Sequence, residues 1–302
     1  MGTLIISKSR RVYLPKIGDL VSFLIVSSVF TAFTSFMMLY FSFIVLGVAL
    51  KPILLCTMFL VVYSVYSINK LTDQEEDAIN MPARSTFVHG NERFLLILAI
   101  ASYIVALLLG LVESPLATGI LLIPLLSGIA YSTNPFSIIG IPRLKDIFLV
   151  KSFVVAFSWA VCAAFLPALQ LCGPAKLCFT FPFFFIKVFI NTVLFDVRDV
   201  EGDTLNSVKT IPVVIGIKKT RQSLLIIQSL LVVWLVLFSD LFSEYYVILI
   251  ASMVYGYLYI LHFCNTSHHR DMSWDILLEG EWILMGIGAC IYLVLSSNVG
   301  NI

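Results

Sequence analysis

Long apolar runs alternate with short polar connections along the whole chain. A helix needs about 20 apolar residues to cross a bilayer core, and nine runs reach or approach that length: 21–48, 52–69, 94–112, 115–132, 152–169, 177–195, 223–238, 245–263 and 276–295. The first run is long enough to tilt or kink. No stretch remains for a soluble domain, so we expect a single integral-membrane domain over 1–302, with a short arm at 1–17.

Composition supports this pattern. The 302 residues are 60% hydrophobic and 12% charged, and the mean hydropathy is +1.00. Too few polar groups are present to cover a soluble surface, so lipid must surround most of the chain. The net charge of +1 offers no basic surface for a nucleic acid, and we expect no such partner. The predicted fold class is therefore all-α and polytopic, with nine transmembrane helices.

The basic residues predict an orientation, because lysine and arginine collect on cytoplasmic connections. With the N-terminus in the cytoplasm, all of the 19 basic residues fall on the cytoplasmic side except Lys51, Lys176 and Lys187. Nine crossings then place the C-terminus outside. No plastid or mitochondrial presequence is visible, which favours the plasma membrane of a prokaryote.

An acidic cluster follows the second run, in the stretch NKLTDQEED. Asn69, Asp73 and Asp77 are spaced i, i+4 and i+8, so an unbroken helix would carry all three on one face. A second cluster follows the sixth run, in FDVRDVEGD. Asp196 and its neighbours Asp199 and Asp203, at i, i+3 and i+7, again share a face for as long as the helix persists, and we expect it to end near Gly202.

Four crossings separate the two clusters, so both leave the membrane on the same side and can face one site. Carboxylates converging at the mouth of an apolar bundle repel one another unless cations hold them together. Carboxylate and amide oxygens suit Mg²⁺, which completes its shell with water and substrate phosphates. Basic groups that could bind those phosphates are Arg84, Lys145, Arg198 and Lys209. The plainer interpretation, exposed acids at hydrated helix ends, explains one cluster better than two matched ones.

These motifs resemble the signature regions of the UbiA superfamily of intramembrane prenyltransferases, in order and spacing, over nearly the whole chain. The resemblance rests on NKLTDQEED followed by Pro82 and Arg84, on YSTNPF with Lys145 downstream, and on DVRDVEGD followed by KTIPVVIG. The family's NDxxDxxxD pattern falls on Asn69, Asp73 and Asp77. Its second DxxxD pattern falls on Asp199 and Asp203, with Asp196 one turn earlier, and its loop tyrosine falls on Tyr131. Lys70 stands where the family usually has Asp, so either Lys70 or Glu76 takes over that position's role.

The resemblance implies a bundle around a central cavity that opens to lipid and is capped by cytoplasmic loops. It implies Mg²⁺-assisted departure of pyrophosphate from an isoprenyl diphosphate of the dimethylallyl to geranylgeranyl class, followed by capture of the allylic cation by a lipophilic acceptor. The acceptor class stays open between an aromatic ring or quinone precursor, a haem or chlorin, and a glycerol lipid. The implied catalytic residues are Asp73, Asp77, Asp199, Asp203 and Tyr131. The implied substrate-binding residues are Asn69, Arg84, Lys145, Arg198 and Lys209, and the implied metal ligands are Asn69, Asp73, Asp77, Asp196, Asp199 and Asp203.

Two other functions fit part of the pattern. A cation-coupled transporter or channel also carries acids in a helical bundle, although its site is expected near the midplane. A terpene cyclase on the same fold would need no acceptor. Three further ionisable residues lie in apolar surroundings: Lys187 in mid-span should snorkel, pair or line a polar cavity, and Glu279 and Glu281 could face either the cavity or the headgroups.

Overall fold

The computed structural model describes residues 17–132, 147–170, 173–265 and 272–299, and within these ranges every regular element is a helix. Eight helices of the described residues are long and apolar enough to cross a membrane, and the shorter Pro115–Ile129 is apolar as well. These segments correspond one for one to the predicted spans. The all-α, polytopic fold class is therefore confirmed.

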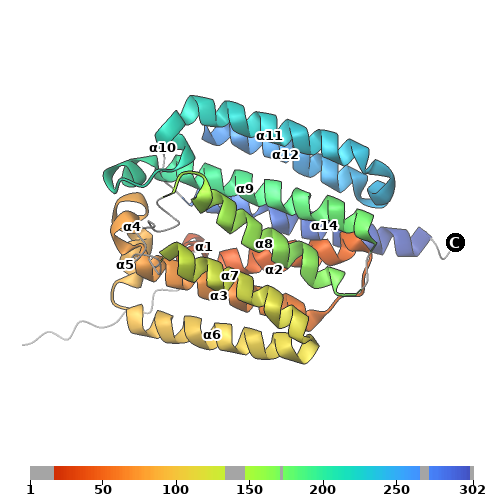
Figure 1. The fold of residues 1–302 in the computed structure, drawn as a ribbon, viewed down its shortest axis with the longest axis horizontal. Coiled ribbons are helices and arrows are strands. Elements are labelled where there is room, and N and C mark those ends of the chain that lie inside the picture. Colours follow the sequence, from red (N-terminus) through yellow and green to blue (C-terminus); the bar gives the residue numbers. More distant parts are fainter. Residues whose placement is uncertain (1–16, 133–146, 171–172, 266–271, 300–302) are drawn as a thin grey trace, which may run out of the picture.

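The helices run roughly along one direction, with α11 and α12 on one side of the bundle and α6 on the other (Figure 1). The short helices α4, α5 and α10 gather at one end. The bounds are α1 Ile17–Val26, α2 Val29–Leu46, α3 Pro52–Thr72, α4 Gln74–Asn80, α5 Pro82–Val88, α6 Glu92–Glu113, α7 Pro115–Ser132, α8 Val150–Ala168, α9 Pro174–Leu205, α10 Ile211–Ile215, α11 Ile217–Leu237, the 3₁₀ helix η3 Ser239–Tyr245, α12 Tyr246–Phe263, α13 Ser273–Glu279 and α14 Glu281–Val299.

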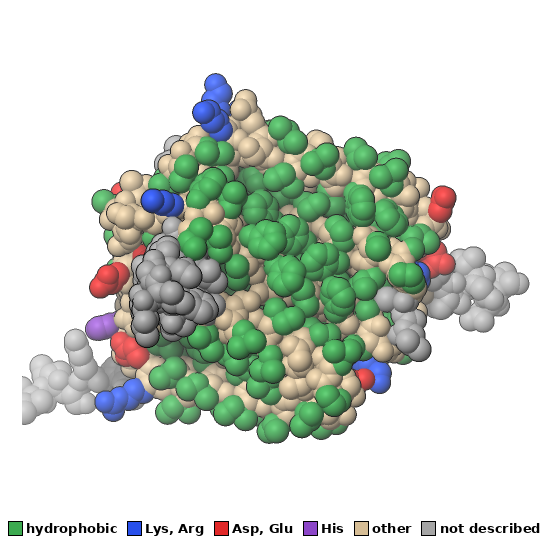
Figure 2. Space-filling view, in the orientation of Figure 1, with side chains coloured by type: hydrophobic (Ala, Val, Ile, Leu, Met, Phe, Trp, Pro, Cys, Tyr) green, Lys and Arg blue, Asp and Glu red, His purple; other side chains and the backbone are tan. Residues whose placement is uncertain are grey.

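The outer surface of the bundle is apolar. Hydrophobic side chains cover the middle of the face drawn in Figure 2, and charged side chains gather toward its two ends. Large exposed apolar residues include Ile97, Val112, Ile226, Leu237 and Val247. A band of this kind is stable only in hydrocarbon, and helices suit it because they satisfy their own backbone hydrogen bonds. The protein is a multi-pass membrane protein.

The first and last predicted spans are each divided into two helices. The first breaks between α1 and α2, where Ser28 has a left-handed backbone with φ of 67°, so the expected kink is present. The last breaks at Gly280, between α13 and α14. Each break brings the end of a short helix toward the end of the bundle that carries the acidic clusters.

One local prediction about the acidic segments is wrong, and another is refined. The second span does not continue as an unbroken helix, because α3 ends at Thr72 and Asp73 has φ of −106° and ψ of 29°. Its N–H still donates to the carbonyl of Asn69 at 3.0 Å, and α4 begins at the next residue, Gln74. Gly202 itself does not end the sixth span, since α9 continues to Leu205. Gly202 instead allows a close approach of α4, because a Cβ there would lie 2.4 Å from the side chain of Asn80.

Candidate active site

A polar cavity of about 170 Å³ lies where α3, α4 and α5 meet α8, α9 and α13. The structure brings both acidic clusters to this cavity, although 119 or more residues separate them in sequence. Its polar lining is Thr31, Tyr66, Asn69, Lys70, Asp73, Glu76, Asp77, Asn80, Arg84, Lys151, Thr192, Asp196, Arg198, Asp199, Asp203, Asp275 and Glu279.

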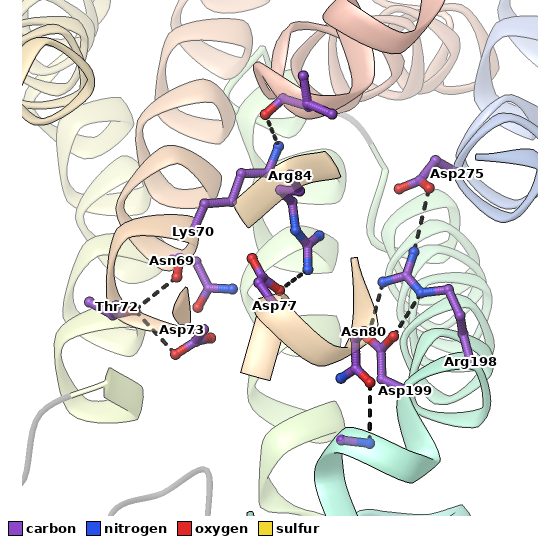
Figure 3. A network of polar contacts seen from close by, with 12 residues as sticks. Asn69, Lys70, Thr72, Asp73, Asp77, Asn80, Arg84, Arg198, Asp199 and Asp275 are labelled. Carbon is purple, nitrogen blue, oxygen red and sulfur yellow. Dashed lines mark hydrogen bonds and ion pairs between the residues drawn. The ribbon is translucent and has the colours of Figure 1, made fainter. Parts of the chain in front are cut away.

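The first cluster comes from the junction of α3 and α4. Asp77 is buried and forms an ion pair with Arg84, at the start of α5. Burial raises the pKa of Asp77, and the neighbouring guanidinium of Arg84 opposes that shift. Asp73 is half-buried and accepts a hydrogen bond from the Thr72 hydroxyl at 3.3 Å. Figure 3 draws Asp73 beside Thr72 at the end of α3 and Asp77 next to Arg84.

The second cluster lies on the inner face of α9, where each acid has a basic neighbour. Arg198 binds both oxygens of Asp199, with Nε–Oδ1 of 2.8 Å and Nη2–Oδ2 of 3.0 Å. Its Nη1 reaches Asp275 of α13 at 3.4 Å. The guanidinium therefore bridges two helices, and its bidentate geometry is the strong form of such a pair.

Lys151, at the start of α8, connects two acids of the second cluster. Its Nζ lies 2.8 Å from Asp196 Oδ1 and 3.8 Å from Asp203 Oδ2. The other oxygen of Asp196 accepts a hydrogen bond from the Ser152 hydroxyl at 2.9 Å. Both oxygens of Asp196 thus have protein partners, whereas Asp203 Oδ2 is buried with no hydrogen-bond partner among the described residues.

Asn80 joins the two halves of the site. Its side-chain oxygen accepts a hydrogen bond from the backbone N–H of Gly202 at 3.2 Å (Figure 3). Because this contact links α4 directly to α9, it fixes the separation of the two acidic clusters.

Position 70 has a structural role. Lys70 Nζ donates to the backbone carbonyls of Ile25 at 3.0 Å and Val26 at 2.9 Å. These carbonyls end α1, where the helix leaves them without intrahelical partners and where a positive charge is favourable. An ammonium cannot ligate a cation. Of the two candidates for the family's usual Asp, Glu76 therefore remains, and it lines the cavity.

Of the predicted residues, Lys209 does not line the cavity, and the side chains of two others fall outside what the structure describes. Lys209 is exposed, because the chain turns after α9 and places Val208 and Thr210 inward on either side of it. Tyr131 belongs to the last turn of α7, and its side chain lies outside the described residues. Lys145 lies outside them entirely.

Sequence reasoning missed Lys151, Asn80 and Asp275 as parts of the site. It left Glu279 open between the cavity and the headgroups, and Glu279 lines the cavity. A signal existed for each, since Lys151, Asp275 and Glu279 lie at or near the ends of spans on the side of the acidic clusters and Asn80 closely follows the first cluster. The sequence did not show that α4 and the starts of α8 and α13 lie beside α9.

The acids are separated by basic groups rather than gathered together. Among the residues that the structure describes, no three acidic, histidine or cysteine side chains converge closely enough to hold a metal alone. Oxygen donors from the two clusters instead line one cavity, and each cluster is paired with cations: Asp77 with Arg84, Asp199 with Arg198, and Asp196 with Lys151. This arrangement could bind a highly charged anion in two ways: directly through the basic side chains, and indirectly through a metal that bridges the anion and the carboxylates.

Comparisons with known proteins identify the family and the fold. The profile of the UbiA prenyltransferase family matches residues 20–277, and no curated protein matches the chain. A UbiA homologue from Archaeoglobus fulgidus, solved with GPP and Mg²⁺, is 16% identical with a TM-score of 0.61 and covers 89% of this chain and 99% of its own. Digeranylgeranylglyceryl phosphate synthase is 16% identical with a TM-score of 0.57, covering 90% and 99%. A UbiA homologue from Aeropyrum pernix K1 is 13% identical with a TM-score of 0.58, covering 88% and 98%.

The solved structures share the fold with this chain, and the family profile covers most of its length, including both acidic clusters. The chain belongs to the UbiA prenyltransferase family and is an intramembrane prenyltransferase.

Proposed function

We propose that this protein transfers an isoprenyl group from a magnesium-bound isoprenyl diphosphate to a lipophilic acceptor inside the membrane, releasing pyrophosphate. One observation carries the proposal: carboxylates of α4 and α9 and cations of α5, α8 and α9 line one cavity at the end of an apolar bundle. The charged head of such a substrate fits the polar cavity, and its hydrocarbon chain fits the bundle.

The donor set suits magnesium. Mg²⁺ in proteins keeps several waters and takes only one or two carboxylates together with substrate phosphates, so two separated groups of oxygens are sufficient. Asp203 supports this assignment, because its Oδ2 is buried without a hydrogen-bond partner among the described residues. The residues that would hold the metal are Asn69, Asp73, Asp77, Asp199 and Asp203, and Asp196 joins them if Lys151 turns away. When bound, magnesium would polarise the leaving diphosphate as a Lewis acid.

The chain's own cations would bind the phosphate oxygens. Arg84, Lys151 and Arg198 each pair with a carboxylate of the cavity, so each can turn to a phosphate when that carboxylate takes a metal. Asp196 keeps Lys151 in place through a 2.8 Å contact. Lys145 and Tyr131 remain predicted partners of the same substrate.

Aromatic rings border the region where positive charge would develop. Tyr66 and Phe195 both line the polar cavity and the apolar space beneath it. Tyr66 stacks on Trp159 with 6.0 Å between ring centroids, which fixes the orientation of its ring. A ring face within about 6 Å stabilises a cation, and an allylic cation leaving the diphosphate would form beside these two rings.

Solved relatives support the substrate classes. The Archaeoglobus fulgidus homologue was solved with GPP and Mg²⁺ and also with DMAPP and Mg²⁺, and another relative is a digeranylgeranylglyceryl phosphate synthase. We place this protein in the same group of reactions, with a dimethylallyl to geranylgeranyl diphosphate as donor. Its acceptor would be an aromatic quinone precursor or a glycerol lipid. We also place it in a prokaryotic plasma membrane, with the N-terminus in the cytoplasm.

The test is transfer by the purified protein in lipid nanodiscs. Labelled geranyl and geranylgeranyl diphosphates are incubated with Mg²⁺ and with hydroxybenzoate, hydroxynaphthoate and glycerol phosphate ether acceptors. We expect labelled prenylated acceptor and an equal amount of pyrophosphate, and no product when Mg²⁺ is chelated. Cyclic hydrocarbon formed without acceptor would identify a terpene cyclase. Cation flux with no consumption of diphosphate would identify a transporter.

A further inference from the structure

Two apolar cavities adjoin the polar cavity. The first, which we name the side cavity, has a volume of about 220 Å³ and lies between α3, α7 and α8. It shares Tyr66, Asn69 and Val155 with the polar cavity. The second, which we name the central cavity, has a volume of about 60 Å³ and lies between α2, α3, α8, α9 and the α13–α14 junction. It shares Thr31, Tyr66, Thr192, Phe195 and Glu279 with the polar cavity.

The side cavity offers few free polar groups. Away from the polar cavity, its two serines bind each other, with 2.9 Å between the hydroxyl oxygens of Ser158 and Ser127. A ligand that needs hydrogen bonds would lose them on entering such a space, whereas a hydrocarbon chain would not. Ile129 lines the cavity and is 48% exposed on the lipid-facing surface, so a long chain can extend outward there. The other apolar residues of the wall are Val65, Ile68, Pro124, Leu125, Val154 and Trp159.

The central cavity is lined differently, because polar groups with unused hydrogen-bonding capacity reach it. Glu279 Oε2 and Asn191 Oδ1 are buried with no hydrogen-bond partner among the described residues. No described lysine or arginine lies within 4 Å of the Glu279 carboxylate. The cations nearest to it are engaged elsewhere, since Lys70 binds backbone carbonyls and Arg198 binds Asp199 and Asp275.

A buried carboxylate oxygen and a buried amide oxygen that lack donors indicate a ligand that brings donors. An isoprenyl chain has none. A phenol, a naphthol or a glycerol hydroxyl has one, and that hydrogen must be lost when its oxygen or its activated ring carbon is alkylated. The acceptor therefore matches the central cavity, and the isoprenyl chain matches the side cavity.

We propose that the two apolar cavities divide the substrates: the side cavity holds the isoprenyl chain, and the central cavity holds the acceptor with its nucleophilic atom beside Glu279. This rests on the proposed function. The bond between C1 of the isoprenyl group and the diphosphate oxygen breaks, and its electron pair leaves with pyrophosphate. A new bond forms from the acceptor's ring carbon or hydroxyl oxygen to C1, and the proton that the acceptor loses passes to Glu279 Oε2.

Gly128 provides a direct test of the side cavity. It lines that cavity, and a Cβ added there meets no atom within 4 Å, so Gly128→Phe fills the space without a backbone clash. Gly119, on the same helix, is also open but faces outward, and Gly119→Phe is the matched control. Binding of non-hydrolysable dimethylallyl and geranylgeranyl diphosphate analogues is measured with Mg²⁺ by calorimetry in nanodiscs.

We expect Gly128→Phe to weaken binding of the geranylgeranyl analogue at least about 30-fold and to change binding of the dimethylallyl analogue less than about threefold. Gly119→Phe should change neither. Equal effects on both chain lengths, or no effect on either, would overturn the assignment of the side cavity. A parent protein that binds neither analogue with Mg²⁺ would instead contradict the proposed function.

Glu279→Gln tests the central cavity with the acceptor that the parent protein alkylates. Removing a positioned proton acceptor typically costs a factor of 10² to 10⁴, so we expect transfer to fall at least about 100-fold while binding of the magnesium diphosphate analogue stays within threefold. Glu279→Asp should recover part of the transfer. Normal transfer by Glu279→Gln, or an equal loss of diphosphate binding, would overturn the role of Glu279, and a parent that alkylates no acceptor would overturn the proposed function with it.

Discussion

Lys187 of α9 and Glu281 of α14 form a buried ion pair inside the bundle, with 2.6 Å between Nζ and Oε1. The ammonium also donates to the Tyr259 hydroxyl at 3.0 Å and to the Ser252 carbonyl at 3.2 Å. Glu281 accepts a further hydrogen bond from the Ser252 hydroxyl at 2.5 Å. The mid-span lysine thus pairs, one of the three outcomes that the sequence allowed, and the pair holds α14 against α9 and α12 immediately after the Gly280 break.

Glu281→Ala should destabilise the protein strongly. It would leave the Lys187 charge buried and uncompensated, which typically costs about 3 to 5 kcal/mol. The double variant Lys187→Met with Glu281→Leu should recover most of this loss, because it removes both charges. Unfolding in detergent by denaturant titration measures the difference. Glu113→Ala is the control: its 3.0 Å pair with Lys51 is partly exposed, so about 0 to 1 kcal/mol is expected. Equal effects of Glu113→Ala and Glu281→Ala would contradict this account.

Lys70→Asp should impair the protein although it restores the residue that the family usually has at this position. The aspartate would face the carbonyl ends of α1 in place of the ammonium that now binds them, and like partial charges repel there. We expect faster hydrogen exchange in the backbone of 17–26 and weaker binding of the diphosphate. Lys70→Arg keeps the charge and should lose less. Unchanged exchange in Lys70→Asp would refute the role assigned to Lys70.

The spans were predictable because apolar length and the spacing of charges are local properties of the sequence. The breaks were harder to predict. Nothing in the composition of 21–48 marks Ser28 for a left-handed conformation, since the break depends on Lys70, which lies 42 residues later and supplies the missing hydrogen-bond donor. Gly202 illustrates the same limit. A glycine near a helix end usually terminates the helix. Here the missing side chain instead lets Asn80 of α4 approach closely.

Asp73→Ala, Asp77→Ala, Asp199→Ala and Asp203→Ala should each remove most prenyl transfer while the fold stays intact. Each removes one proposed oxygen ligand, and the weaker neutralisation of the leaving group should raise the barrier by about 2 to 4 kcal/mol. Initial rates with saturating labelled geranyl diphosphate measure the effect. Glu75→Ala and Glu201→Ala are same-region controls, because both side chains are exposed and neither lines the cavity. Near-normal rates in all four aspartate variants would exclude the two-cluster site.

Single cysteines at Thr86 and Leu205 should react with an impermeant maleimide from the same side of the membrane, the cytoplasmic one. A cysteine at Leu50 should react from the other side, because Leu50 lies at the opposite end of α3. The prediction follows from the distribution of basic residues and from the shared cavity of the two acidic clusters. Labelling of positions 86 and 205 from opposite sides would contradict it.

The candidate site was partly predictable, because its acids and amides recur at helical spacing on two spans of equal orientation. Among its basic residues, Arg84 and Arg198 were predicted and line the cavity, but the sequence did not separate Lys151 from Lys209, since lysines at span ends set topology as well as binding substrates. Lys151 and Lys209 both flank a span on the same side, yet only Lys151 reaches an acid of the cavity. The difference lies in packing: α8 begins beside Asp196, whereas the chain after α9 turns Lys209 outward.

Arg84→Ala and Lys151→Ala should weaken diphosphate binding even without metal, because their side chains can contact phosphate oxygens directly. Asp73→Ala and Asp199→Ala should instead reduce the gain in affinity that magnesium gives, since carboxylates attract the diphosphate only through a cation. Affinity for a non-hydrolysable geranyl diphosphate analogue, measured with Mg²⁺ and with chelator in each variant, separates the two effects. Loss of the magnesium dependence in the basic variants alone would contradict this division.

Binding of the donor by the parent protein tests whether the two acidic clusters hold the diphosphate through magnesium. The affinity of the parent protein for the non-hydrolysable geranyl diphosphate analogue is measured in nanodiscs by calorimetry at increasing magnesium concentrations. A sample with chelator is the metal-free reference. Two carboxylate clusters around a diphosphate repel it until cations intervene, so we expect a loss of affinity of at least about 100-fold on chelation. Tight binding that does not change between chelator and saturating magnesium would contradict it.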